Sequence, residues 1–122
     1  MSYIQWYLDE IGRILHRLPH DQIARIVGIL RRARLERRRI YLIGNGGSAA
    51  TASHFANDLL KSTIAEGKPR MQVIALTDNI PVMLAYANDC GYETIFAEQL
   101  DALAAPGDVL TGDLAATYTF GK

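Results

Sequence analysis

The sequence contains a single cysteine, Cys90, and has no excess of either charge. One cysteine excludes an internal disulfide framework. The 13 basic residues are balanced by 13 acidic ones, which excludes a strongly basic nucleic-acid binder. No apolar run approaches the roughly 20 residues of a membrane span, and the first residues lack the pattern of a secretory signal. These absences indicate a soluble cytoplasmic domain with no membrane partner.

Apolar residues make up 49% of the 122 residues, so we expect a single domain with a buried core. The charge is uneven, because residues 1–39 hold nine arginines and carry a net charge of +5. The arginine cluster at 31–39 is either a nucleic-acid patch or a solvated helix end. Glu36 interrupts it, Leu35 continues an apolar stripe, and no aromatic residue lies among the arginines. These features favour the helix end, and we expect no nucleic-acid partner.

Residues 1–38 are predicted to form a pair of amphipathic helices ahead of the sheet. Pro19 is expected to end the first helix and Asp21 to cap the second. The aromatic cluster Tyr3, Trp6 and Tyr7 is interpreted as a packing surface for another subunit. The apolar residues at helical spacing are Ile4, Tyr7, Leu8, Ile11, Leu15 and Leu18, and then Ile23, Ile26, Val27 and Leu30.

Residues 39–110 alternate between strand-like and helix-like segments, which predicts an α/β fold with a parallel sheet. Strands are expected at 39–43, at 72–76 and from Val109 onward. Helices are expected at 49–61, 82–87 and 93–103, with a loop at 88–92. In the helix at 49–61, Phe55, Leu59 and Leu60 are the predicted packing residues.

A glycine-rich turn, GNGGS at residues 44–48, lies between the first strand and the helix that follows it. A helix N-terminus offers unpaired backbone N–H groups and a positive dipole end, and glycine lets the backbone approach an anion closely. The turn therefore predicts a phosphate or sugar-phosphate site, with a tight turn that binds nothing as the alternative. It matches neither the dinucleotide fingerprint nor the P-loop, since Ser48 is followed by two alanines and no lysine.

His54 and Asp58 lie four residues apart, so they share one face of the predicted helix. The pair has three interpretations. It provides two ligands of a metal site, or Asp58 is a general base beside the turn, or the pair is a surface contact without function. The spacing alone leaves all three open.

Three segments of the sequence resemble the phosphosugar isomerase (SIS) domain family, and within it the phosphoheptose isomerases. They are IYLIGNGGSAATASHFANDL, ALTDNIPVMLAYANDCGYETIFAEQL and APGDVL, and the similarity runs over residues 3–110. The resemblance implies a three-layer α/β/α fold with a parallel sheet. It also implies conversion of sedoheptulose 7-phosphate to a heptose 7-phosphate, and a homo-oligomer, dimer or tetramer, packed through the N-terminal helices.

The resemblance assigns roles to individual positions. His54 matches a zinc ligand of several family members, and Asp58 stands where the isomerases have a Glu that ligates the metal and transfers the proton. Zinc at His54 and Asp58, and catalysis by Asp58, are therefore implied. The residues that match the substrate contacts are Asn45, Gly46, Gly47 and Ser48 in the first loop and, within one residue, Asp78 and Asn79 after the second strand.

The resemblance weakens after the third strand. The family continues there with a Ser/Thr-rich phosphate loop and with β–α units that supply a Gln and a His, whereas residues 111–122 hold no such loop and no histidine. We therefore expect one domain over 1–122 with an atypical tail at 111–122 and a sheet truncated on that side. Residues 117–122 are a candidate for a last strand, and an uncovered sheet edge favours oligomerisation.

Three functions remain open at this point. The first is an isomerase of the phosphoheptose type, which the three motif segments favour. The second is a non-catalytic SIS module that binds a sugar phosphate or a protein partner. The tail and Asp58 favour it, since Asp is one methylene shorter than Glu and a misplacement of about 1 Å costs on the order of 100-fold in rate. The third is an unrelated α/β phosphate binder, such as a nucleotide module.

Overall fold

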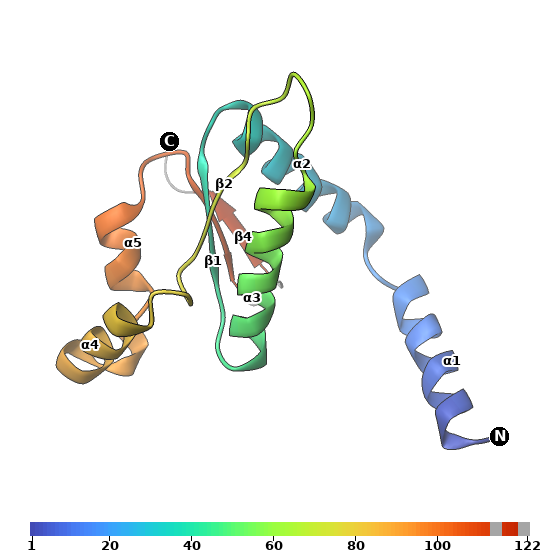
Figure 1. Ribbon diagram of the computed structural model, residues 1–122. Coiled ribbons are helices and arrows are strands. Elements are labelled where there is room, and N and C mark those ends of the chain that lie inside the picture. The colour runs from blue at the N-terminus through green and yellow to red at the C-terminus, as the bar shows by residue number, and fades with distance from the viewer. Residues whose placement is uncertain (113–115, 120–122) are drawn as a thin grey trace.

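The computed structural model describes residues 1–112 and the backbone of residues 116–119 (Figure 1). Within these ranges the helices are α1 (Tyr3–His16), α2 (His20–Leu35), α3 (Gly47–Asn57), α4 (Ile80–Cys90) and α5 (Ala97–Leu103). The strands are β1 (Arg39–Ile43), β2 (Gln72–Ala75), β3 (Val109–Gly112) and β4 (Ala116–Thr119). A π-helical turn, η1 (Asp58–Ser62), follows α3, and a 3₁₀ turn, η2 (Tyr92–Thr94), lies between α4 and α5.

The strands form one sheet in the order β2-β1-β3-β4. β1 pairs in parallel with β2 and β3, so that Tyr41 lies opposite Ile74 on one side and Leu110 on the other. The predicted parallel sheet is confirmed for these three strands. β4 pairs antiparallel with β3, because only residues 113–115 separate them and a parallel pair needs a crossover of roughly a dozen residues. The last strand expected within 117–122 is thus present as β4, and residues 120–122 lie outside the described residues.

Helices cover both faces of the sheet, which confirms the three-layer α/β/α fold. α2 and α3 lie on one face, and α4 and α5 lie on the other (Figure 1). β1 contacts both layers, because successive side chains of a strand point to opposite faces. Ile40 and Leu42 join the apolar core with α2 and α3, whereas the Tyr41 hydroxyl donates to the Leu103 carbonyl oxygen of α5 at 2.8 Å. All three β1 side chains are at most 1% exposed, so both layers fix the central strand.

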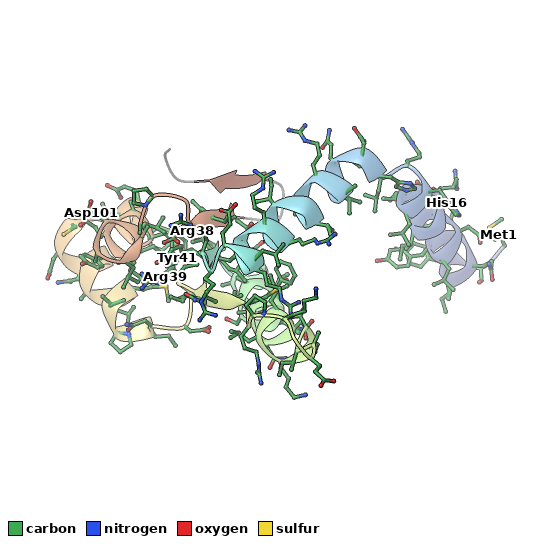
Figure 2. The ribbon with its side chains drawn as sticks, turned by 90° about the horizontal axis from the view of Figure 1, so that it is seen from above. Met1, His16, Arg38, Arg39, Tyr41 and Asp101 are labelled. Carbon is green, nitrogen blue, oxygen red and sulfur yellow. The ribbon has the colours of Figure 1, made fainter. Side chains whose placement is uncertain are left out.

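The predicted N-terminal helix pair is present, but α1 stands away from the sheet (Figures 1 and 2). No residue of α1 is buried. The aromatic cluster of Tyr3, Trp6 and Tyr7 is 46–73% exposed, although the Tyr3 and Trp6 rings lie 5.5 Å apart. Packing of this cluster against another subunit therefore remains a prediction. In the described part of the chain, no helix combines the length and the apolar character needed to cross a membrane.

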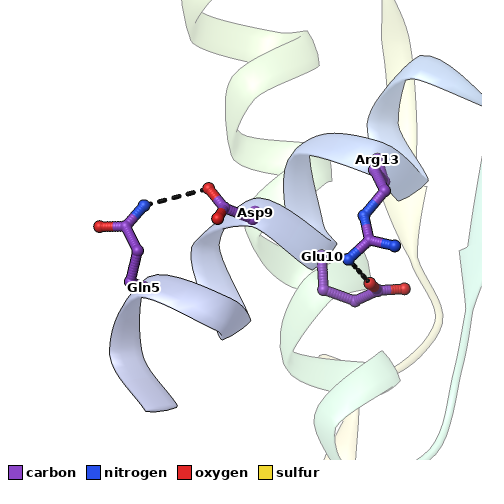
Figure 3. A network of polar contacts seen from close by, with 4 residues as sticks. All are labelled: Gln5, Asp9, Glu10 and Arg13. Carbon is purple, nitrogen blue, oxygen red and sulfur yellow. Dashed lines mark hydrogen bonds and ion pairs between the residues drawn. The ribbon is translucent and has the colours of Figure 1, made fainter. Parts of the chain in front are cut away.

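Local contacts stabilise the polar side of α1. The Ser2 hydroxyl caps the helix by accepting the Gln5 backbone N–H at 3.2 Å. The Gln5 amide donates to Asp9 at 3.0 Å, and Arg13 pairs with Glu10 at 2.7 Å (Figure 3). Pairs at these spacings contribute about 0.2–0.5 kcal/mol each, so α1 is supported as a helix without a contact to the sheet.

The predicted cap of α2 is wrong. Pro19, and not Asp21, occupies the N-cap position, and no side chain caps the helix there. Pro19 has no N–H to give to a preceding turn, so it separates the two helices as expected. Asp21 lies inside the first turn of α2, where its carboxylate faces the positive end of the helix dipole.

Several predicted helix boundaries differ from the structure. α3 begins at Gly47, two residues earlier than expected, and the helix predicted at 93–103 is divided into η2 and α5. The loop predicted at 88–92 is wrong for its first three residues, because α4 continues to Cys90. The Asn79 side chain caps the start of α4, and Gly91, with φ of +100°, ends it.

Two of the three packing residues predicted in the helix at 49–61 are confirmed. Leu59 is buried and Phe55 packs against the core. Leu60, however, is 44% exposed. Both residues lie in the π-helical turn η1, and only Leu59 joins the core.

Candidate functional site

The GNGGS turn connects the end of β1 to the start of α3. Gly44 has no room for a side chain, because a Cβ there would lie 2.5 Å from the Ser48 carbonyl oxygen. Gly46 has φ of +53°, a conformation that favours glycine. The Ser48 N–H donates to the Asn45 carbonyl oxygen at 2.9 Å, but the N–H groups of Gly46 and Gly47 have no acceptor among the described residues. Two such donors at a helix N-terminus have the geometry of an anion cradle.

A polar cluster lies beside α3, where β2 ends. Thr77 is 8% exposed, and its hydroxyl lies 3.1 Å from the hydroxyl of Ser53 on α3. Ser53 also donates to the carboxylate of Asp78. The Asn79 side chain accepts the Val82 N–H at 3.3 Å as the cap of α4. Of the two predicted substrate contacts, Asp78 is therefore held by α3 and Asn79 is engaged in a helix cap.

A first pocket of about 200 Å³ opens between the GNGGS turn, α4 and η2. Asn45, Thr77 and Tyr92 supply its polar side chains, and the Asn45 amide donates to the Tyr92 hydroxyl. The remaining lining residues are Gly44, Gly46, Ala49, Met83, Leu84, Ala87, Ile95 and Phe96. The pocket thus combines a few hydrogen-bonding groups with a largely apolar wall, as small-molecule sites commonly do.

His54 and Asp58 form a separate surface pair. The His54 Nε2 and Asp58 Oδ2 atoms lie 3.6 Å apart, and the two side chains are 76% and 52% exposed. Together with Thr51 and Phe55 they line a second pocket of about 300 Å³. An exposed carboxylate beside an imidazole is accessible to a substrate as a base and to a cation as a ligand.

The structure therefore divides the predicted site residues between two faces of α3. Ala49 lines the first pocket and His54 the second, and the step of five positions from one to the other turns the helix by about 140°. Asn45 and Gly46 lie at the first pocket, whereas Asp58 lies at the second. Gly47 and Ser48 begin the helix from which both faces extend. The first pocket consequently lacks the predicted catalytic carboxylate.

The zinc site implied by the resemblance can be compared with the side chains present. His54 and Asp58 offer two ligands, whereas zinc sites in proteins use three or four. The described residues contain no cluster of three or more His, Cys, Asp or Glu side chains able to hold a metal ion. These residues do not fit a zinc ion by themselves, and no chemical step is assigned to a metal.

Ser53 and Tyr92, near the first pocket, received no role from the sequence, and Thr77 was included only through the one-residue margin given to Asp78 and Asn79. Thr77 had a usable signal, because it lies two residues after β2, a strand that ends at the same sheet edge as the turn. Ser53 lies four residues after Ala49, and this spacing puts both on one helix face. Tyr92 contacts Asn45 across 47 residues of sequence, a distance at which no local pattern predicts a contact.

The comparison with known proteins agrees with this architecture. The SIS domain family matches residues 6–112. A phosphoheptose isomerase from Aquifex aeolicus is 43% identical over 92 residues, which cover 75% of this chain and 48% of that protein. A probable phosphoheptose isomerase from Thermoplasma acidophilum is 40% identical over 106 residues, which cover 87% of this chain and 58% of that protein. The chain thus spans about half the length of the curated relatives it matches.

Two solved structures that resemble this chain are also phosphoheptose isomerases. A phosphoheptose isomerase from Neisseria gonorrhoeae superposes with a TM-score of 0.77 at 26% identity, covering 89% of this chain and 56% of that one. A phosphoheptose isomerase from Francisella tularensis has a TM-score of 0.70 at 25% identity, covering 92% of this chain and 60% of that one. On the match over residues 6–112 and on the fold, the chain belongs to the SIS domain family.

Proposed function

We propose that the chain is a phosphosugar isomerase domain that acts on sedoheptulose 7-phosphate and forms a heptose 7-phosphate. The observation that carries this proposal is the GNGGS turn at the end of β1. Its Gly46 and Gly47 N–H groups, without acceptors among the described residues, lie at the N-terminus of α3. A phosphate group suits this place, because the N–H groups and the helix dipole both favour negative charge. The similar proteins are named phosphoheptose isomerases, which supports a seven-carbon sugar phosphate as the substrate.

The proposed reaction moves one proton between neighbouring carbon atoms. A base removes a proton from the carbon next to the carbonyl group, and the carbonyl oxygen takes up a proton, so that an enediol forms. The former carbonyl carbon then receives a proton, and the hydroxyl on the neighbouring carbon loses its proton as it becomes the new carbonyl group. We assign the role of the base to Asp58, whose carboxylate is accessible beside His54. A base must come within about 3 Å of the proton it takes. The reacting carbon atoms of the sugar must therefore lie over the face of α3 that carries Asp58.

A turnover assay tests this assignment. The chain is incubated with sedoheptulose 7-phosphate, and formation of the heptose 7-phosphate is followed by proton NMR. We expect Asp58→Asn to abolish turnover, because an amide does not accept the proton. Asp101→Asn, at an exposed position of α5, is the control and should retain it. Full turnover by Asp58→Asn would show that another group is the base.

A second candidate is a non-catalytic SIS module that binds a sugar phosphate or a protein partner. The separation of the two pockets favours it, since Asp58 lies outside the pocket that contains the turn. The short side chain at position 58 favours it as well. Binding of sedoheptulose 7-phosphate without turnover would support this candidate. Membership of the SIS family removes the third candidate, an unrelated phosphate binder.

A homo-oligomer, in the cytoplasm, is also part of this proposal. It is supported by the apolar side chains of α1, none of which is buried within the chain. We propose that a second copy of the chain packs against these side chains. Light scattering coupled to gel filtration should then report a dimer or tetramer. Trp6→Glu should shift the population toward the monomer, and a wild-type monomer would contradict the proposal. Zinc at His54 and Asp58 remains a proposal that needs ligands from outside the described residues.

A further inference from the structure

One hydrogen bond connects the GNGGS turn to the opposite wall of the first pocket. The side-chain Nδ2 of Asn45 donates to the hydroxyl of Tyr92, which lies 47 residues later in the sequence. Both side chains line the pocket. The bond therefore links a residue of the proposed phosphate loop to η2, a turn that the proposed function has not used.

Contacts within its own segment hold Tyr92 in place. Gly91 has φ of +100°, a backbone conformation that favours glycine. The Thr94 hydroxyl donates to the Gly91 carbonyl oxygen at 2.8 Å. Ile95 is buried, and its carbonyl oxygen accepts the Gln99 amide at 2.7 Å. The exposed phenol of Tyr92 thus extends from a fixed backbone.

The bond to Tyr92 decides what Asn45 offers to a ligand. An amide side chain has two N–H donors on Nδ2 and one acceptor oxygen, and Tyr92 engages one of the donors and thereby fixes the orientation of the amide. The Oδ1 atom of Asn45 then remains as an acceptor, with no partner among the described residues. A sugar hydroxyl donates to such an atom, whereas the doubly ionised phosphate group of a sugar phosphate has acceptors only and is repelled by it.

We propose that Tyr92 is a positioning residue that, through Asn45, presents an acceptor to a sugar hydroxyl beside the bound phosphate. This inference rests on the proposed function of the GNGGS turn as a sugar-phosphate site. It assigns the preference for a hydroxylated ligand over phosphate alone to a contact outside the glycine-rich segment. Loss of one neutral hydrogen bond of this kind weakens binding by about threefold to tenfold.

Calorimetric titrations test the proposal with two probes, sedoheptulose 7-phosphate and inorganic phosphate. The proteins are the wild type, Tyr92→Phe, Asn45→Ala and the double variant. Tyr92→Phe removes a hydroxyl from a side chain that is 62% exposed, so the fold should persist. The matched control is Tyr86→Phe on α4, because the Tyr86 hydroxyl has no hydrogen-bond partner in the described structure.

We expect Tyr92→Phe to bind sedoheptulose 7-phosphate about threefold to tenfold more weakly and inorganic phosphate as well as the wild type does. The double variant should bind like Asn45→Ala, because Tyr92 acts through Asn45. The side-chain amide resonances of Asn45 in a ¹⁵N–¹H spectrum give an independent readout without ligand. They should move in Tyr92→Phe and stay in place in Tyr86→Phe.

The outcomes separate this inference from the proposed function. Unchanged sugar-phosphate affinity in Tyr92→Phe would overturn the positioning role while the proposed site stands. Equal weakening for both probes would overturn it too, since the turn itself would then be damaged. If the wild type bound inorganic phosphate but not sedoheptulose 7-phosphate, the proposed contact between Asn45 and a sugar hydroxyl would be refuted. If the wild type binds neither probe, the proposed function fails first and the inference fails with it.

Discussion

Two glycines of the same turn should respond in opposite ways to substitution by alanine. Gly44→Ala places a methyl carbon 2.5 Å from the carbonyl oxygen of Ser48 and 2.6 Å from its carbonyl carbon. Both atoms belong to the backbone of the first turn of α3, so the start of the helix must move to relieve the contact. Overpacking of this kind costs about 1–3 kcal/mol, and the free energy of unfolding should fall by that amount.

Gly47→Ala is the matched control for this prediction. A Cβ at Gly47 meets nothing within 4 Å, and the residue is the first of α3 without a positive φ. Alanine at a compatible position stabilises by about 0.4–1 kcal/mol, because it restricts the unfolded chain. The two variants differ only in where one methyl group lies. Their free energies of unfolding should therefore differ by about 1.4–4 kcal/mol.

Urea unfolding followed by circular dichroism measures this difference. A helix signal is preferable to tryptophan fluorescence, because Trp6 lies in α1, which makes no core contact. Equal midpoints with equal slopes would refute the reasoning, since the close approach at Gly44 would then have no energetic weight. A phosphate titration of Gly47→Ala adds a second reading. The new methyl group lies beside the cradle, so phosphate binding should weaken while the fold gains stability.

Three further substitutions test one contact at the start of β1 and two positions around the site. Asp108→Asn should lower the free energy of unfolding in urea by about 2–4 kcal/mol, with the exposed Asp101→Asn as the control. The Asp108 carboxylate is 3% exposed, and each of its oxygens accepts a backbone N–H at 2.9 Å, whereas an amide keeps only one acceptor oxygen. Ser53→Ala should cost about 1–3 kcal/mol in thermal unfolding, because it leaves a buried threonine hydroxyl without its partner. Asp58→Asn should keep the wild-type affinity for inorganic phosphate in an NMR titration, and a loss there would contradict the separation of the two pockets.

Elements with strong local signals were predicted closely. The first strand was expected at 39–43 and is observed as Arg39–Ile43, because an apolar run of β-forming residues is bounded by arginine and glycine. The second was expected at 72–76 and ends one residue earlier. Helix ends were predicted less well, since they depend on caps such as the Asn79 side chain that compete with other local options. A last strand was expected in the tail, and the antiparallel orientation of β4 follows from its short connection to β3.

The candidate site was only partly predictable for a different reason. The GNGGS turn combines a strand end, a helix start and three glycines, so its place and geometry follow from local sequence. That His54 and Asp58 share a helix face also follows from their spacing. Which face of α3 packs on the sheet, and which meets the first pocket, depends on tertiary contacts such as the Ser53–Thr77 pair. Residue spacing could therefore predict neither the division into two pockets nor the contact between Tyr92 and Asn45.

The two pockets share one element, the N-terminus of α3, and this decides how their chemistry is related. From that end Ala49 leads into the first pocket and Thr51 into the second. A phosphate held by the backbone N–H groups lies at the end of the helix and belongs to neither face, so its sugar has two directions open. Over the first face it meets Asn45 but no carboxylate, whereas over the second it approaches Asp58. Binding at the turn and proton transfer at Asp58 are thus tested separately under the proposed function, and high affinity without turnover would favour the non-catalytic candidate.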